Sequence, residues 1–317
     1  MPIEPVNGRK VSQVKVAEGD VAVVTRPAEK KKGWIAKQRD RFVEATGLTA
    51  FAPLEKPPAL KRPVVMIPGL TMPASSYDPL ARNLATDKAN GPVATFVAAT
   101  GEFHYGGKDG RVMSDIEVKN TKIFQLEYKN AKAAPTEKAP QIAAMMQAVA
   151  TKTGRKDVDV VTHSAGGHDF RQYLDTRTEA HVNVGKLAMI GPVTHGTVMG
   201  NIGSAVGGVL GLKEASDQLG IGDDLVKHLD AAWPKARAQI GGDVNIIGIS
   251  GAPTLGPKGK NGELGFQTGD GYVQADELGL PGAKVKVLKG ADPTPIAHLK
   301  EVGYSGVVNE VQRILGQ

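Results

Sequence analysis

Beyond residue 63, apolar residues occur in short continuous runs separated by segments of helical length. Six runs have the length of strands and cover residues 64–67, 93–98, 158–161, 187–190, 244–249 and 285–288. Continuous apolar runs are typical of strands buried on both faces of a parallel sheet. The intervening and final segments predict helices over residues 78–86, 136–153, 165–177 and 305–315. This alternation predicts an α/β fold, with a mostly parallel central sheet and helices on both faces.

Two stretches of this region do not follow the alternation. Residues 122–128 are compatible with a further strand or with an edge segment, and the pattern leaves both open. Residues 198–236 begin Gly-rich and apolar (VMGNIGSAVGGVLGL) and continue as an amphipathic segment. We predict that residues 198–236 form an insertion over the sheet.

The first 62 residues have a different pattern. Alternating apolar residues at 14–16 and 21–24 flank the turn sequence EGD and predict a β-hairpin. Residues 30–46 predict a helix, and the prolines between residues 53 and 58 favour a linker that ends at Arg62. The predicted organisation is an N-terminal extension over residues 1–62 and a main domain over residues 63–317.

The net charge of +6 comes entirely from this extension. Residues 1–62 hold 13 Lys and Arg against 7 Asp and Glu, whereas residues 63–317 hold 26 of each kind. Such a basic segment is typical of a solvated tail or helix face, and anchoring to a membrane surface is the alternative. No aromatic residues alternate with the basic ones, so nucleic acid is not an expected partner.

The chain has no cysteine, which excludes disulfides, Cys-based zinc sites, iron–sulfur clusters and a cysteine nucleophile. Its first 20 residues lack the apolar core of a secretory signal, and no apolar run approaches the ~18 residues of a spanning helix. The sequence therefore predicts a cytoplasmic protein, with non-classical export left open.

The most informative segment is VVTHSAGG, residues 160–167, in which a strand runs directly into Ser164 and then into a helix. This is the setting in which a G-x-S-x-G pattern indicates a nucleophile, because the sharp turn lifts the serine hydroxyl above the sheet. Thr162 replaces the first glycine of the pattern. The segment predicts Ser164 as a catalytic nucleophile.

A serine nucleophile needs a base to take its proton and an acid to orient that base. In an open α/β sheet these groups lie at the carboxyl ends of strands. Asp270 and His298 occupy such positions, in the chain order serine, acid, base expected of this fold. His195 is the best alternative base but precedes every plausible acid, and Asp292 is a weaker alternative acid.

The other histidines are less suitable as the base. The period of a strand turns the side chain of His163 away from that of Ser164. His168 lies one turn into the following helix and is predicted to be structural.

The developing oxyanion needs preorganised N–H donors. One is predicted to be the backbone N–H of Ala165, directly after the nucleophile. The other is predicted from the turn IPGLT, where Gly69 lets the backbone turn towards the site and leaves the Leu70 N–H as the donor. No cofactor and no metal are expected in this chemistry.

Residues 63–315 resemble the α/β-hydrolase superfamily, and within it the bacterial lipases and esterases. The resemblance rests on four parts of the sequence: VVMIPGLTMPASSY, the turn at residues 162–167, IGPVTHGT, and the pair of stretches at 270–273 and 298–302. It implies a serine carboxylester hydrolase acting on small-molecule or lipid esters, with transient contact to a lipid surface. It also implies that the insertion at 198–236 is a lid or cap.

The sequence leaves two other functions open. The same residues can transfer the acyl group to another acceptor or cleave an amide, because acceptor choice depends on pocket geometry. A non-catalytic protein of this fold that binds a lipid or a partner is the second alternative. The acyl chain length and the oligomeric state are not determined by these patterns.

Overall fold

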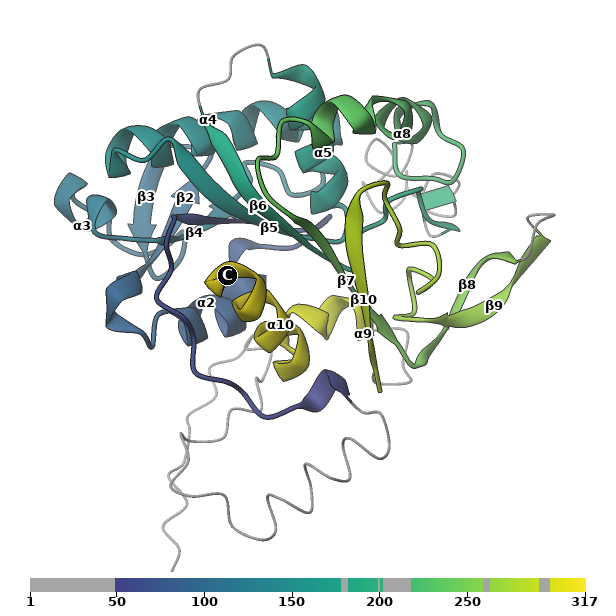
Figure 1. The fold of residues 1–317 in the computed structure, drawn as a ribbon. Helices are drawn as coiled ribbons and strands as arrows, with labels where there is room; N and C mark the ends of the chain where they lie inside the picture. Colours follow the sequence, from purple (N-terminus) through teal and green to yellow (C-terminus); the bar gives the residue numbers. More distant parts are fainter. Residues whose placement is uncertain (1–48, 178–181, 199, 202–217, 259–262, 291–296) are drawn as a thin grey trace, which may run out of the picture.

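The computed structural model describes residues 49–317, apart from residues 178–181, 199, 202–217, 259–262 and 291–296. The predicted N-terminal hairpin and helix, and much of the Gly-rich part of the predicted insertion, lie outside the described residues. The described chain forms an eight-stranded sheet, a two-stranded ribbon and helices on both faces of the sheet (Figure 1).

The strands of the sheet are parallel except for one pair at an edge. Their spatial order is β10 (Ala283–Lys289), β7 (Val244–Ser250), β6 (Asn183–Ile190), β5 (Asp157–His163), β1 (Val64–Ile67), β4 (Ile123–Glu127), β2 (Val93–Val97) and β3 (Glu102–Tyr105). Only β2 and β3 are antiparallel within it. The ribbon consists of β8 (Ala252–Lys258) and β9 (Glu263–Gly269). The carboxyl ends of the parallel strands share one edge, where the candidate residues are expected to meet.

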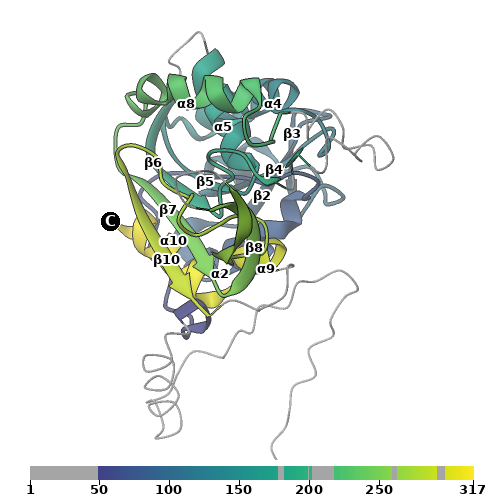
Figure 2. The same ribbon diagram turned by 90° about the vertical axis from the view of Figure 1, so that its right-hand side faces the viewer.

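Helices form a layer on each face of the sheet, as Figures 1 and 2 show. One layer contains α4 (Pro135–Thr153), α5 (Gly166–Thr176) and α8 (Asp224–Arg237), and the other contains α2 (Asp78–Leu84) and α10 (Ser305–Gly316). The short helices are α3 (Asp115–Lys119) and α9 (Ala297–Lys300). Short 3₁₀ turns are η1 (Thr49–Phe51), η2 (Ala74–Tyr77), η3 (Lys88–Asn90) and η4 (Glu301–Gly303).

Each central strand contributes to two apolar clusters. Val65 and Ile67 of β1 belong to the cluster beneath α4 and α5, whereas Val64 and Met66 belong to the cluster beneath α2 and α10. Because alternate side chains of a strand point to opposite faces, a strand with both faces buried favours apolar residues at successive positions. This is the physical reason for the continuous apolar runs.

The six predicted strands and four predicted helices are confirmed, with shifted ends in most cases. Residues 122–128 contain β4, an inner strand between β1 and β2. The prediction that every strand is buried on both faces is wrong for β10, which is an edge strand whose Val285 is 45% exposed. The sequence patterns do not predict β3, α3, α9 or the ribbon, because these elements are short or, in the ribbon, contain proline and glycine.

Residues 49–62 pack against the body of the molecule. Ala50 and Leu60 are buried, and the Leu60 N–H donates to Asn90 Oδ1 over 2.7 Å. Asn309 of α10 accepts from the Glu55 N–H through its side-chain oxygen and donates from its side-chain nitrogen to the Pro53 carbonyl. The predicted linker is therefore attached to α10 and to the 3₁₀ turn that precedes β2. The domain boundary after residue 62 stays a prediction.

No helix in the described ranges is long and apolar enough to cross a membrane.

Candidate active site

Ser164 lies in the predicted turn between β5 and α5. Its φ of +53° is in the left-handed region, which residues other than glycine rarely adopt. The turn is held from both sides, because the Ser164 N–H donates to the Ile190 carbonyl of β6 over 2.9 Å and the Gly167 N–H donates to the Ser164 carbonyl over 3.0 Å. This strained conformation brings the hydroxyl to the carboxyl edge of the sheet.

Gly166 allows α5 to begin directly against the loop that follows β1. A Cβ at this position would lie 2.6 Å from the carbonyl oxygen of Ile67 and 2.7 Å from that of Pro68. Any larger residue would therefore push the helix and the loop apart. Thr162, which replaces the first glycine of the usual pattern, is fully buried on β5.

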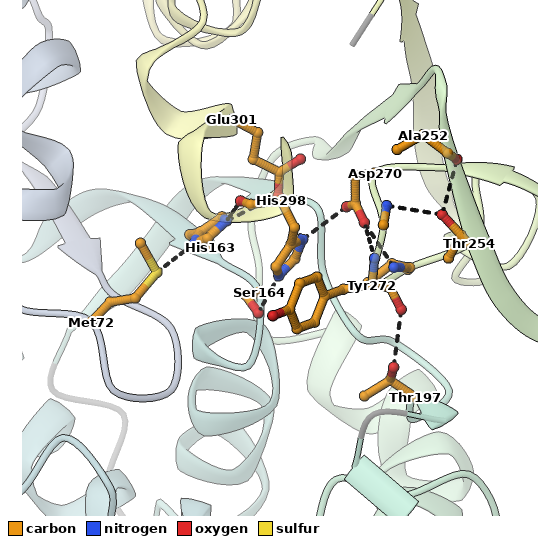
Figure 3. Close-up of polar contacts among 12 residues, drawn as sticks. Met72, His163, Ser164, Thr197, Ala252, Thr254, Asp270, Tyr272, His298 and Glu301 are labelled. Carbon is orange, nitrogen blue, oxygen red and sulfur yellow. Dashed lines mark hydrogen bonds and ion pairs between the residues drawn. The ribbon is translucent and has the colours of Figure 1, made fainter. Parts of the chain in front are cut away.

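Three side chains from distant parts of the sequence form one hydrogen-bonded chain (Figure 3). His298 Nε2 lies 2.7 Å from Ser164 Oγ, and His298 Nδ1 lies 2.8 Å from Asp270 Oδ2. Asp270 directly follows β9, and His298 is on α9 after β10. Asp270 Oδ1 also accepts the N–H groups of Tyr272 and Val273, which fixes the carboxylate. In this arrangement the imidazole can take the proton of the serine while the carboxylate orients it.

Opposing effects set the pKa values of His298 and Asp270. Burial alone lowers the pKa of His298, but the negative charges of Asp270 and Glu301 and the hydrogen bonds to them raise it well above its ordinary value. Burial raises the pKa of Asp270, and the neighbouring His298 and two backbone N–H groups outweigh it, so this pKa is lowered. The structure therefore favours an ionised Asp270 that stabilises the positive form of His298.

Glu301 is a second buried carboxylate beside His298, and it is not among the residues predicted from the sequence. Its Oε1 lies 3.3 Å from His298 Nδ1 and 2.9 Å from His163 Nε2. The side chain is fully buried, and Gly191 makes room for it, since a Cβ there would lie 1.9 Å from the same oxygen. The spacing of three residues between His298 and Glu301, one helical turn, was the only signal in the sequence.

Two rings contact the imidazole of His298. The centroid of the Tyr272 ring lies 5.0 Å away with an interplanar angle of 24°, and the centroid of the His163 ring lies 5.0 Å away at 33°. His163 is turned away from the Ser164 hydroxyl, as predicted, and its Nε2 also approaches the His298 carbonyl at 3.1 Å. These contacts leave the imidazole little freedom to rotate.

The loop after β1 lies against the nucleophile. A Cβ built on Gly69 would be 3.0 Å from Ser164 Cβ, so this loop and the serine are in direct proximity. The next N–H groups of the loop are engaged elsewhere, because the Thr71 N–H donates to the Ala131 carbonyl and the Met72 N–H to the Gly69 carbonyl. Among the described residues, neither the Leu70 N–H nor the Ala165 N–H donates to another backbone carbonyl.

The comparisons with known proteins concern structure alone. No protein-family model matches the chain, and no curated protein matches its sequence. The crystal structure of the lin2722 gene product of Listeria innocua matches with a TM-score of 0.54 and 17% identity, over 81% of this chain and 94% of that chain. With the strand order and the strained serine after β5, this similarity decides the fold. The chain has the α/β-hydrolase fold.

Two further similar structures were found. Mature lipase BlEst2 of Bacillus licheniformis matches with a TM-score of 0.47 and 18% identity, over 79% of this chain and 90% of that chain. Phospholipase PlaB of Legionella pneumophila matches with a TM-score of 0.48 and 14% identity, over 81% of this chain and 59% of that chain.

The alternative base His195 takes part in a different network. Its Nδ1 lies 2.8 Å from Asp230 Oδ2 of α8, and its Nε2 lies 2.8 Å from the Gly279 carbonyl. Asp230 also accepts from Arg171 of α5. His195 therefore connects α8 to the sheet and is not bonded to Ser164. The alternative acid Asp292 lies outside the described residues.

His163, His298 and Glu301 also present ligand atoms within 4.8 Å of one another, which is the spacing of a metal site. Both nitrogens of His298 are bonded to Ser164 and Asp270, however, and the Glu301 oxygen is bonded to His163. Both nitrogens of His298, His163 Nε2 and Glu301 Oε1 thus take part in internal hydrogen bonds around the candidate base.

Proposed function

We propose that this protein is a serine carboxylester hydrolase, a lipase or esterase that acts on esters with an apolar acyl group. The observation that carries the proposal is the hydrogen-bonded chain from Ser164 Oγ through His298 to Asp270. The strained backbone of Ser164 at the start of α5 supports it, because this is the setting of a nucleophile in the α/β-hydrolase fold.

In the proposed mechanism, His298 accepts the proton of the Ser164 hydroxyl as its oxygen attacks the ester carbonyl. Asp270 orients the imidazole and stabilises its positive form. The N–H groups of Leu70 and Ala165 donate to the oxyanion of the tetrahedral intermediate, which collapses and releases the alcohol with the proton from His298. Water, activated by the same imidazole, then attacks the acyl-enzyme and frees the acid.

Hydrolysis of p-nitrophenyl esters from acetate to palmitate tests this proposal, with the Ser164→Ala variant as the comparison. We expect turnover by the wild type and a loss of at least about 10³-fold in the variant. Ser75→Ala removes an exposed hydroxyl outside the hydrogen-bonded chain and is the matched control. Equal turnover by Ser164→Ala and the wild type would exclude Ser164 as the nucleophile, and no turnover in folded wild type would favour acyl transfer or a binding role.

Residues 63–317 would form the catalytic domain, with 1–62 as a basic extension and 198–236 as a cap. The start of the cap lies beside the acid loop and beside Leu219 within the cap, because the Thr197 N–H donates to the Leu219 carbonyl and the Thr197 hydroxyl donates to the Tyr272 carbonyl. A cap anchored there would control access to His298. A mobile cap predicts that turnover rises when the ester concentration exceeds its solubility limit.

A further inference from the structure

The ribbon formed by β8 and β9 has one apolar, exposed face. Figure 1 shows that it leaves the body of the molecule beyond β7 and β10. In its antiparallel register Leu255 pairs with Phe266 and Pro257 pairs with Leu264. Directly paired residues point to the same side of a ribbon. Leu264 is 66% exposed and Phe266 is 69% exposed, while their two partners are half-buried.

The opposite face of the ribbon packs on the protein and connects it to the candidate site. Thr254 is fully buried, and its Oγ1 accepts the Gly271 N–H of the acid loop over 2.9 Å. The Gly251 N–H donates to the Gly269 carbonyl, and Asp270 is the next residue in the chain. The orientation of the exposed face is therefore fixed relative to Asp270.

The position of the ribbon also relates it to the candidate site. The ribbon begins directly after the carboxyl end of β7, and Ser164 and His298 also follow the carboxyl ends of strands. Leu299, the residue after His298, is also apolar and is 42% exposed. Adjacent exposed apolar side chains, such as Leu264 and Phe266 on the ribbon, indicate a surface that contacts something apolar.

The size of this face indicates what it contacts. A phenylalanine and a leucine side chain at these exposures present at most a few hundred Å² of apolar surface. A stable protein–protein interface buries about 800 Å² on each partner. The face is thus too small for a stable partner protein or dimer, whereas a few apolar side chains are sufficient for shallow insertion into a lipid surface.

We propose that the apolar face of the β8–β9 ribbon docks this protein on the surface of a phospholipid bilayer. The inference rests on the proposed function, since an enzyme for apolar esters meets its substrate at such a surface. Leu264 and Phe266 enter the acyl region, and the ribbon keeps Asp270 and the site it completes at a set distance from the bilayer. The attraction is apolar, so it persists at high salt.

The test is co-sedimentation of the full chain with neutral phosphatidylcholine vesicles in high salt, which suppresses attraction of the basic N-terminal extension. All proteins carry Ser164→Ala, so that binding is measured without turnover. We expect the added pair Leu264→Ser and Phe266→Ser to lower the vesicle partition coefficient at least tenfold. The matched control pair is Val112→Ser and Ile116→Ser, which are 51% and 69% exposed near β3 and α3. The control pair is expected to bind as the parent does.

Three outcomes would overturn the proposal. The first is that the protein with Ser164→Ala alone (the parent) and the one that also carries Leu264→Ser and Phe266→Ser (the ribbon variant) bind vesicles equally. The second is that the ribbon variant and the control variant lose binding equally. The third is that the parent is a dimer and the ribbon variant is a monomer. A separate Phe266→Trp variant is expected to shift its emission to the blue on addition of vesicles, and no shift would also contradict insertion. Because binding does not depend on turnover, absence of ester hydrolysis by the wild type would count against the proposed function alone.

Discussion

At the scale of single residues, the candidate base is held by more groups than a catalytic triad requires. His298 is bonded to Ser164 and Asp270, lies 3.3 Å from the oxygen of Glu301 and stacks on Tyr272. Since the two carboxylates favour the positive form of the imidazole, they set the pH at which the base becomes neutral and available.

Glu301→Gln keeps the size of this side chain and removes its charge. Because Glu301 raises the pKa of His298, that pKa falls in the variant. The base must be neutral to accept a proton, so we expect the acid limb of the kcat/KM profile to move to lower pH by about one unit. The measurement is kcat/KM of a soluble ester against pH.

The control for this variant is Glu310→Gln. Glu310 is also a helical carboxylate with little exposure, but it pairs with Lys286 and Arg313 away from the triad. Its substitution is expected to leave the acid limb in place. An unshifted acid limb in Glu301→Gln would show that its charge does not act on His298.

Tyr272 offers a second prediction at this scale. Its backbone N–H bonds Asp270 whatever the side chain is, so substitutions report on the ring alone. Tyr272→Phe keeps the stacking on His298 and is expected to retain kcat, whereas Tyr272→Leu is expected to lower kcat about tenfold because the imidazole is less well oriented. Steady-state kinetics on one soluble ester compares the two. Equal kcat values in both variants would rule out a positioning role for the ring.

At the scale of elements, an ion pair between Asp230 of α8 and Arg171 of α5 joins the two helices. Asp230 accepts from Arg171 over 2.7 Å and pairs with His195, and the Arg171 side chain is only 1% exposed. Removing one partner of a buried ion pair leaves the other charge without compensation. The C-terminal helix of the predicted insertion thus depends on this carboxylate for its attachment.

Asp230→Ala is therefore expected to lower the free energy of unfolding by about 2 kcal/mol, a value kept below that of a fully buried pair because Asp230 is itself 33% exposed. Asp224→Ala in the same helix removes an exposed carboxylate and is expected to change little. Urea denaturation measures both. Equal stabilities of the two variants would contradict the attachment.

At the scale of the whole molecule, residues 49–62 belong physically to the body that carries the site. Leu60 is buried in the cluster beneath α2 and α10, and its N–H is bonded to Asn90. Ala50 is buried in the same cluster. The predicted linker therefore contributes to the core, although its prolines favour an extended connection.

Leu60→Ala is expected to destabilise the protein by about 3 kcal/mol, the cost of a cavity in a packed core. Lys56→Ala, in the same segment and exposed, is the control and is expected to leave stability unchanged. The midpoint of thermal unfolding measures the difference. A Leu60→Ala variant as stable as the control would mean that the segment only rests on the surface.

Much of the fold follows from patterns that are local in the chain. The continuous apolar runs predict β1, β2, β5, β6 and β7, because burial on both faces favours apolar residues at successive positions of a central strand. The turn at Ser164 is a strand–turn–helix signal contained in eight residues. The order of Ser164, Asp270 and His298 along the chain then selects the same three residues that the structure joins by hydrogen bonds.

Other features arise only when distant segments pack together. His163 and Glu301 are 138 positions apart, and no local pattern predicts that they share a hydrogen bond beside His298. The position of β10 at the edge depends on which strands pair with it, although its apolar run resembles that of an inner strand. The local sequence pattern determines whether a residue is buried or lies in a turn. Which residues become its neighbours is determined by the long-range packing of the sheet and its two helical layers.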